Sequence, residues 1–247
     1  MLARIDFNCD LGEGCDDAAM MPYISSANIA CGLHAGDAST MRRTVALCIA
    51  HDVAIGAHPS FDDRENFGRK AQAIAPEAAY ALVLRQIEAL AAIAREHDAM
   101  LRHVKPHGAL YNQAAQDVAL ADAIARAVRD FDPSMILFGL SGSALTDAGV
   151  SHGLRVAHEA FAERRYQANG RLVPRSEADA VIQDLHASLA QVRALVREGR
   201  VIANTGDSVA LRADTLCLHG DRADAAEFAR AVRELLAADG VLVQAAS

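Results

Sequence analysis

The sequence predicts an α/β protein of the (β/α)-barrel kind, a single domain that is TIM-like but distorted, with about seven parallel strands. Short β-like runs alternate with Ala-rich helical stretches along the 247 residues, and this alternation is typical of a parallel sheet. Neither GxGxxG after the first strand nor GxxxxGK[ST] occurs, so the two common nucleotide fingerprints of open sheets are missing. Nearly every expected strand ends in polar residues, which favours a barrel because its strand ends converge on one rim.

The expected elements follow one another regularly, and the whole chain, residues 1–247, is expected to form one domain. Strands are expected over residues 4–8, 27–31, 53–57, 101–104, 135–140, 154–158 and 215–218. Amphipathic helices are expected over residues 76–96, 118–129, 177–198 and 222–238. Pro76 suits a first helical turn, and Gly199 and Gly240 stand where helices commonly end. Units of roughly 35 residues are a reasonable size for a parallel βα repeat.

Composition excludes several classes of protein. A hydrophobic content of 52% allows a sizeable core, whereas a net charge of −8 argues against binding nucleic acid. The five cysteines are odd in number and lack CxxC spacing, and no secretory signal is recognisable, so we expect reduced thiols and a cytoplasmic location. No apolar run reaches about 18 residues, so no membrane span is expected.

The densest concentration of chemistry is His-Val-Lys-Pro-His-Gly-Ala-Leu-Tyr-Asn, residues 103–112. This segment leaves the fourth expected strand and places Lys105, His107, Tyr111 and Asn112 within ten residues. The proline removes a backbone donor and ends strand pairing, and the glycine lets the backbone approach a ligand. A cation, an imidazole, a phenol and an amide at a strand exit indicate a functional site.

Other strand ends contribute imidazoles, carboxylates and amides. The first strand leads to Asn8, Asp10 and Glu13, and the second, which contains Asn28, leads to His34 and Asp37. The third leads to His58, the sixth to Glu159, and the last to His219 and Asp221. We therefore expect four histidines, several carboxylates and a lysine to face a common bowl. Each of these residues also has a purely structural interpretation. Asp37 could cap the helix that begins near Ser39, Asn28 could be a buried structural amide, and the loop carboxylates could only be solvated or cap backbone groups.

Two further features are ambiguous in the sequence. The charge-rich segment 61–70, with Arg64 and Arg69, suggests a mobile loop that closes over an anion, although such loops are usually only solvated. Cys31 lies near histidines, but a buried, inert thiol is the favoured interpretation.

A set of motifs covers essentially the whole chain in order. They are residues 8–13 (NCDLGE), 28–37 (NIACGLHAGD), 56–59 (GAHP), 67–69 (FGR), 105–112 (KPHGALYN), 159–166 (EAFAERRY), 172–175 (LVPR) and 219–221 (HGD). In these motifs the chain resembles the LamB/YcsF family, the A subunits of bacterial 5-oxoprolinase. One departure is Glu163, which stands where the family usually has aspartate.

The resemblance implies a barrel related to those of polysaccharide deacetylases and glycosidases. It also implies ATP-dependent opening of the 5-oxo-L-proline ring to L-glutamate, together with partner subunits B and C. A lactam is an unreactive amide, and phosphorylation of its oxygen would create a leaving group before water attacks the ring carbon. ATP, with Mg²⁺, is therefore the expected cofactor.

Residue roles follow as expectations. The expected catalytic residues are Asp10, His34, His58, Lys105, His107 and Glu159, with a histidine moving the proton. The expected substrate or phosphate ligands are Asn8, Glu13, Asn28, Asp37, Arg64, Arg69, Tyr111, Asn112, Arg164, His219 and Asp221. Asp10, Glu13, Glu159 or Asp221 could hold Mg²⁺ through oxygen.

Two other functions remain open. His34, His58 and Asp10 could hold Zn²⁺ for amide hydrolysis or deacetylation without ATP, although no HExxH or CxxC settles the point. Alternatively, the chain could be a non-catalytic subunit that presents a 5-oxoproline-like molecule to its partners. The identity of the lactam, binding of ATP by this chain alone, and homo-oligomerisation stay open.

Overall fold

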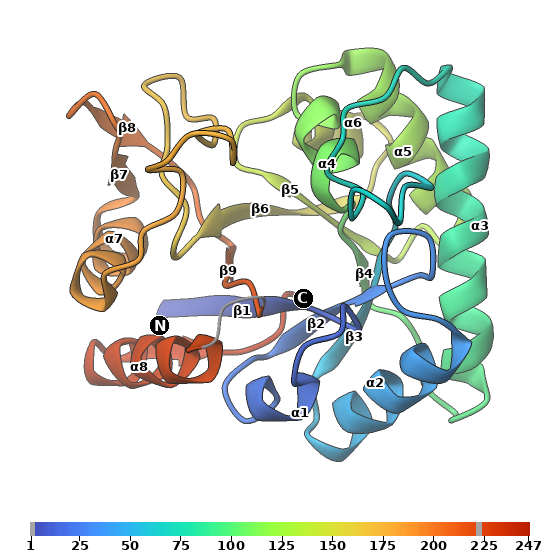
Figure 1. Ribbon diagram of the computed structural model, residues 1–247, viewed down its shortest axis with the longest axis horizontal. Helices are drawn as coiled ribbons and strands as arrows, with labels where there is room; N and C mark the ends of the chain where they lie inside the picture. The colour runs from blue at the N-terminus through green and yellow to red at the C-terminus, as the bar shows by residue number, and fades with distance from the viewer. Residues whose placement is uncertain (1–2, 221–223) are drawn as a thin grey trace.

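A closed ring of seven parallel strands forms the centre of the protein in the computed structural model, which describes residues 3–220 and 224–247 (Figure 1). The strands are β1 (Ala3–Leu11), β2 (Ser26–Ala30), β3 (Ala54–His58), β4 (His103–Val104), β5 (Ile136–Leu140), β6 (Arg155–Phe161) and β9 (Thr215–Cys217). They follow one another in this order around the ring, and pairing of β9 with β1 closes it. The predicted distorted barrel of about seven parallel strands is confirmed.

The barrel interior is unusually polar on one strand in particular. Successive side chains of a strand point to opposite faces, so Asp6, Asn8 and Asp10 share one face of β1 while Phe7 and Cys9 share the other. The three polar side chains bond across the barrel interior, whereas Phe7 and Cys9 belong to the hydrophobic core cluster. The helices therefore bury the apolar outer face of β1, and its polar inner face is available for chemistry.

Helices surround the ring on most sides (Figure 1). They are α1 (Asp17–Met20), α2 (Ala38–Ala50), α3 (Pro76–Arg95), α4 (Gly108–Ala114), α5 (Val118–Phe131), α6 (Ala144–Ser151), α7 (Leu185–Glu198) and α8 (Ala225–Ala238). As predicted, α3 has Pro76 in its first turn and α7 ends at Gly199 in the left-handed conformation. The short helix α4, which directly follows His107, was not among the predicted helices.

The prediction of a helix from residue 177 was wrong in its start. Helix α7 begins at Leu185, because the Asp184 carboxylate accepts a hydrogen bond from the Ala187 N–H and caps the helix there. The segment before it instead crosses back toward Arg164, which forms an isolated antiparallel bridge with Val181.

Three strands were not predicted. Strands β7 (Arg200–Ile202) and β8 (Ser208–Ala210) form an antiparallel hairpin beside α7, outside the barrel ring (Figure 1). Strand β10 (Val241–Val243) pairs in parallel with the first residues of β1. These additions lie away from the strand ends that carry the polar residues.

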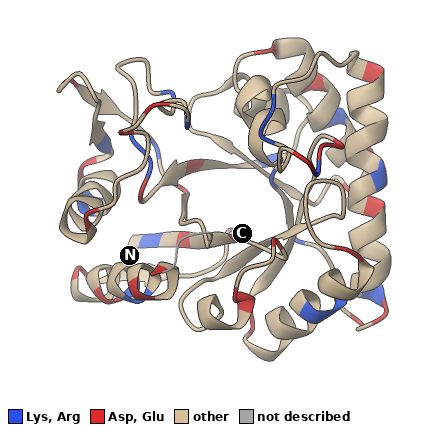
Figure 2. Ribbon diagram, in the orientation of Figure 1, with Lys and Arg blue, Asp and Glu red and all other residues tan. Residues whose placement is uncertain are grey.

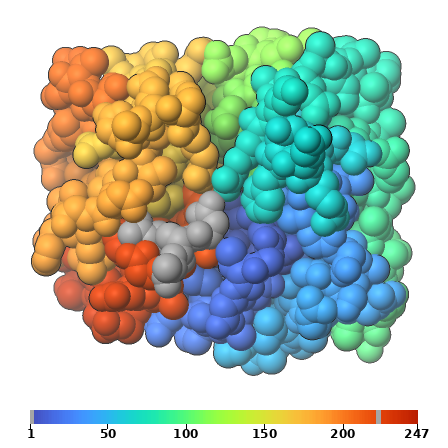
Figure 3. Space-filling model, in the orientation of Figure 1, coloured from blue at the N-terminus to red at the C-terminus, as the bar shows by residue number. Residues whose placement is uncertain are grey.

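Charges of both signs are distributed over the outer helices and the loops (Figure 2). On the face shown in Figure 3, the gold segment that follows β6 lies on one side and the teal segment that precedes α3 on the other. None of the helices in the described part of the chain is long and apolar enough to cross a membrane.

Candidate active site

A buried lysine organises the carboxyl end of the barrel. The Lys105 Nζ lies 2.9 Å from Asp10 Oδ1, 2.9 Å from Glu159 Oε1 and 3.1 Å from Cys217 Sγ. It also lies 3.3 Å from Asn8 Oδ1. These residues come from β1, β6, β9 and the loop after β4, so the site exists only because the ring brings the strand ends together.

Burial and ion pairing act against each other on these groups. Burial disfavours the ammonium, but Asp10, acting together with Cys217 and Glu159, outweighs it and holds the pKa of Lys105 well above its usual value. Burial likewise opposes ionisation of Asp10, yet the charges of His58 and Lys105 hold the pKa of Asp10 well below normal. At neutral pH the site therefore contains a buried ammonium between buried carboxylates.

Hydrogen bonds fix the carboxylate and amide groups around the lysine. The Tyr111 hydroxyl donates to Glu159 Oε2 at 2.7 Å, and Asn8 Nδ2 donates to Glu159 Oε1 at 3.0 Å. Asn28 Nδ2 donates to Asn8 Oδ1 at 2.7 Å and to Asp10 Oδ1 at 2.8 Å. Asn8 and Asn28 therefore orient the carboxylates of Glu159 and Asp10. Asn28 is a buried structural amide, as one interpretation held, and its structural role is to position a group of the site.

Beneath them lies a histidine that the sequence pattern did not single out. His103 is 1% exposed, its Nε2 bonds to Asn28 Oδ1 at 2.8 Å, and its ring stacks on Phe138 at 4.2 Å. Burial lowers the pKa of His103 to about 3, so its imidazole is neutral. The ring also lies against Gly56, where an added Cβ would be 2.0 Å from Nε2. Its position inside an expected strand was the one signal of a buried role.

Three of the four predicted histidines form a cluster with Glu13. The rings of His34 and His107 stack at 3.8 Å, and that of His58 meets His107 edge-on at 4.8 Å. Glu13 Oε1 lies 2.9 Å from His34 Nε2 and 3.2 Å from His107 Nδ1. Burial lowers the pKa of His34 to about 4, whereas bonds from His107 and His34 overcome burial and lower the pKa of Glu13.

The fourth histidine, His219, faces the same mouth from the opposite side of Asp10. Its Nε2 lies 3.8 Å from Asp10 Oδ2, and its Nδ1 bonds to Glu163 Oε1. The Glu163 carboxylate, the departure from the family motif, is buried, and its other oxygen has no hydrogen-bond partner within the described residues. His58, His107 and His219 line one cavity, whereas His34 touches it only through its contacts with His58 and His107.

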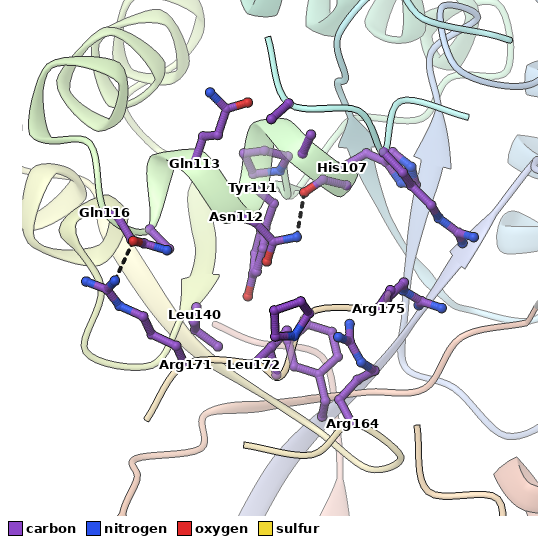
Figure 4. Close-up of a pocket in the computed structure, with 18 of the residues that line it drawn as sticks. His107, Tyr111, Asn112, Gln113, Gln116, Leu140, Arg164, Arg171, Leu172 and Arg175 are labelled. Atoms are coloured by element: carbon purple, nitrogen blue, oxygen red, sulfur yellow. Dashed lines mark hydrogen bonds between the residues drawn. The ribbon is translucent and has the colours of Figure 1, made fainter. Parts of the chain in front are cut away.

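A cavity of about 640 Å³ opens over this network (Figure 4). Asp10, His58, Lys105, His107 and His219 line its polar part, together with Tyr111 and Asn112. Arginines line it farther out, namely Arg69, Arg164, Arg171 and Arg175, of which the last three are labelled in Figure 4 with Gln116, the partner of Arg171. Arg171, Arg175 and Gln116 were not predicted as site residues, although Arg175 belongs to the family motif over residues 172–175.

Some predicted ligands lie elsewhere. Asp37 is exposed and caps α2 by accepting a hydrogen bond from the Thr40 N–H at 2.7 Å, which favours its interpretation as a helix cap over that as a ligand. Arg64 donates to the carbonyls of Gly32 and Gly36 and does not line the cavity. Asn112 lines the cavity while donating to the Gly108 carbonyl at 3.0 Å. Asp221 lies outside the described residues.

The loop after β3 is docked onto the site. The Ala109 N–H donates to the Gly68 carbonyl at 2.9 Å, and a Cβ on Gly108 would lie 2.6 Å from that oxygen. Gly108 and Gly68 both have positive φ, so glycine is favoured at each.

Cys31 is buried with its pKa raised to about 12 by burial, which fits the prediction of an inert thiol.

Comparison with known proteins assigns the chain to a protein family. The sequence model of the LamB/YcsF family matches residues 5–247. The chain belongs to the LamB/YcsF family. A relative from Bordetella pertussis, named as the A subunit of 5-oxoprolinase, is 55% identical over 252 aligned positions that cover all of both chains. The crystal structure of a lactam utilization protein from Thermus thermophilus is 45% identical, with a TM-score of 0.92 over 98% of this chain and all of that one.

The LamB/YcsF barrel also resembles more distant enzymes. A peptidoglycan deacetylase from Bacillus subtilis is 9% identical with a TM-score of 0.50, and the match covers 98% of this chain and 87% of that one. At this identity the likeness shows the fold alone, and it confirms the predicted relation to polysaccharide-deacetylase barrels.

Proposed function

We propose that this chain is the A subunit of a 5-oxoprolinase and carries the site at which the ring of 5-oxo-L-proline opens to L-glutamate. The names of the relatives support this function, since one is the A subunit of a 5-oxoprolinase and another a lactam utilization protein. The observation that carries it is the buried Asp10–Lys105–Glu159 group at the end of an arginine-lined cavity. A small anionic amide needs both parts of this arrangement.

The cavity offers complementary groups for each end of such a substrate. A 5-oxoproline molecule carries a carboxylate, for which guanidinium groups are the preferred partners. Arg69, Arg164 and Arg171 supply that charge along the cavity wall. The amide end would then face Lys105 and Asp10, where an ammonium can stabilise negative charge that develops on the amide oxygen.

Proton transfer belongs to the imidazoles that line the cavity. His58, His107 and His219 do so, whereas His34 does not. His219 has the simplest arrangement, because Glu163 fixes its Nδ1 and its Nε2 faces Asp10 and the cavity. An imidazole held by a carboxylate is a suitable general base or acid near neutral pH.

ATP with Mg²⁺ is proposed as the energy source of the complete assembly with subunits B and C. Reopening a five-membered lactam is unfavourable or nearly so, and phosphorylation of the amide oxygen would activate the ring carbon. Water would add to that carbon, the C–N bond would break as the ring nitrogen takes a proton, and a second water would hydrolyse the resulting acyl phosphate to L-glutamate and phosphate. The three described carboxylates predicted for Mg²⁺ do not form an all-oxygen set, since Asp10 and Glu159 share Lys105 and Glu13 contacts imidazoles. We therefore place nucleotide binding with the partner subunits, and a cytoplasmic location remains a prediction.

The test is formation of glutamate and ADP from 5-oxoproline and Mg·ATP, with this chain alone and then with subunits B and C. We expect glutamate and ADP in equal amounts only in the complete assembly. Replacement of Lys105 or His107 by alanine should abolish both products, and near wild-type turnover would exclude that residue from the mechanism. Absence of glutamate from the complete wild-type assembly would refute the proposed function.

A second function, hydrolysis of an amide without ATP, is favoured by one observation, the convergence of Glu13 with three histidines. Glutamate formed by this chain alone in the absence of nucleotide would support it. A third, the non-catalytic binding subunit, predicts that Lys105→Met still binds 5-oxoproline and leaves turnover of the assembly unchanged.

A further inference from the structure

Four side chains from four successive strand ends direct one ligand atom each to a common point. Glu13, His34, His58 and His107 follow or end β1, β2, β3 and β4, and their ligand atoms all lie within 4.8 Å of one another. His34, His58 and His107 are 1%, 1% and 4% exposed. Donors of this kind, imidazole nitrogen and carboxylate oxygen, are those that Zn²⁺ and related ions prefer.

The far sides of two of these rings are already committed as proton donors. His58 Nδ1 lies 2.7 Å from the Lys105 carbonyl, and His107 Nε2 lies 2.9 Å from the Phe67 carbonyl. A carbonyl oxygen only accepts, so each of these nitrogens carries a proton. A metal-bound imidazole is neutral, so on metal binding the opposite nitrogen of each ring would present a lone pair, and His58 Nε2 and His107 Nδ1 already face each other at 2.9 Å.

The third ring is held in a similar way. His34 Nδ1 lies 2.9 Å from Ser60 Oγ, and that hydroxyl donates to the Phe61 carbonyl at 2.8 Å. A hydroxyl has one hydrogen, so His34 Nδ1 donates to Ser60, and on metal binding His34 Nε2 would present its lone pair beside Glu13 Oε1, which lies 2.9 Å away. One metal ion could therefore replace the protons of this cluster and accept three nitrogen lone pairs and a carboxylate oxygen at once.

One positive centre would satisfy all four atoms, and the spacing fits a metal ion. Tetrahedral Zn²⁺ with bonds of about 2.0–2.1 Å separates its ligand atoms by roughly 3.3 Å. The closest separations here are 2.9 Å for His34–Glu13 and for His58–His107, 3.2 Å for His107–Glu13 and 3.7 Å for His58–Glu13. A single proton on His58 Nε2 would bridge only one of these contacts, and the remaining pairs would still bring two electron-rich atoms together.

We propose that Glu13, His34, His58 and His107 bind one divalent transition-metal ion of the zinc type. The donor set differs from the one expected from sequence, since Glu13 and His107 join the site. Asp10 stands beside it, with Oδ1 bonded to Lys105 and Asn28 and Oδ2 3.3 Å from His58 Nε2. The carbonyls of Lys105 and Phe67 and the Ser60 hydroxyl orient the rings, as partners of metal-bound histidines commonly do. This site depends neither on the identity of the lactam nor on ATP.

The ion would lie between two openings of the protein. His58 and His107 line the main cavity, whereas Glu13 and His34 line a separate hollow on the other side of the cluster. The metal would thus hold His58 and His107 in place in the wall of the main cavity. With three of the four histidines bound, His219 is the imidazole that remains for proton transfer.

The test uses the full chain, purified without chelators, with metal content measured by mass spectrometry. We expect about one equivalent of zinc-type metal per chain, and about one equivalent of Co²⁺ taken up by the chelator-treated protein, with visible d–d absorption. His34→Gln and His107→Gln should lose this uptake, whereas His97→Gln, which changes an exposed histidine, should keep it.

Two milder variants keep the proposal testable where a ligand variant fails to fold, as judged by circular dichroism. Ser60→Ala retains all four ligands but releases His34, so Co²⁺ affinity should fall about 10–100-fold. Glu13→Gln should also weaken Co²⁺ binding measurably. Co²⁺ affinities that are equal in wild type, Ser60→Ala and Glu13→Gln would overturn the proposal. So would metal-free wild-type protein in which ¹⁵N NMR shows one ring of the cluster protonated on both nitrogens.

Discussion

Replacement of Lys105 by methionine tests whether the buried ammonium holds the site together. Its Nζ lies 2.9 Å from both Asp10 Oδ1 and Glu159 Oε1, whose side chains are 5% and 0% exposed. Methionine has a similar shape but no charge, so two buried carboxylates lose their counter-ion. Removal of one partner of a buried ion pair costs about 3–5 kcal/mol, a large part of the roughly 5–15 kcal/mol by which proteins are stable.

The assay is urea unfolding at neutral pH, monitored by circular dichroism, together with the thermal midpoint. For a protein of this size about 3–5 kcal/mol corresponds to a decrease in Tm of roughly 6–20 °C. The chain has one other lysine, the exposed Lys70, so Lys70→Met is a matched control that should change the unfolding free energy by less than about 0.5 kcal/mol.

The double variant Lys105→Met/Glu159→Gln separates loss of charge balance from loss of packing. It removes one of the two stranded anions, so its destabilisation should be smaller than the sum of the two single effects. A Lys105→Met protein within about 0.5 kcal/mol of wild type would refute the charge argument. Strict additivity in the double variant would show that the lysine and Glu159 do not stabilise each other.

Three further outcomes follow from the same network. Gly56→Ala places a Cβ 2.0 Å from His103 Nε2, so overpacking should lower the unfolding free energy by about 1–3 kcal/mol, and an unchanged Tm would contradict the contact. Because burial lowers the folded-state pKa of His103 from 6.5 to about 3, the unfolded chain binds more protons between these values and stability falls on acidification. About 2 kcal/mol of this loss should occur between pH 7 and pH 5 and be absent in His103→Gln, as urea titrations at both pH values would show. Tyr111→Phe removes the 2.7 Å hydrogen bond from the Tyr111 hydroxyl to Glu159 and should lower the free energy of unfolding in urea by about 1.5–3 kcal/mol. An unfolding free energy equal to that of wild type would contradict a bond to a charged carboxylate.

The fold and the gathering of the site could be read from sequence because they depend on local pattern. Apolar runs ending in Asn8, His58 or Lys105 locate strand ends, and parallel connectivity then brings those ends together. The pairing of Glu163 with His219 could not be read, because it joins residues 56 positions apart. The start of α7 was misplaced because an Ala-rich pattern continues upstream of Asp184, where a side-chain cap decides the boundary.

Which polar residues act on substrate and which act on one another also depends on information that a single sequence does not contain. Asp37 and Glu13 both follow strands in glycine-bracketed loops, yet one caps a helix on the surface and the other contacts three histidines. Alternation along β1 shows that Asp6, Asn8 and Asp10 share a face, but not that this face lines the barrel interior. Only the closed ring settles that question.

Asp10 is the residue that joins the two halves of the site. One of its oxygens lies 2.9 Å from Lys105 Nζ, and the other lies 3.3 Å from His58 Nε2 and 3.8 Å from His219 Nε2. A change of charge on the lysine side is therefore felt by the histidines through a single carboxylate, because low-dielectric surroundings screen these contacts poorly. This connection explains why a pKa far below normal is useful at this position: Asp10 stays ionised while protons move around it, so it can stabilise a cation on either side without accepting the proton itself.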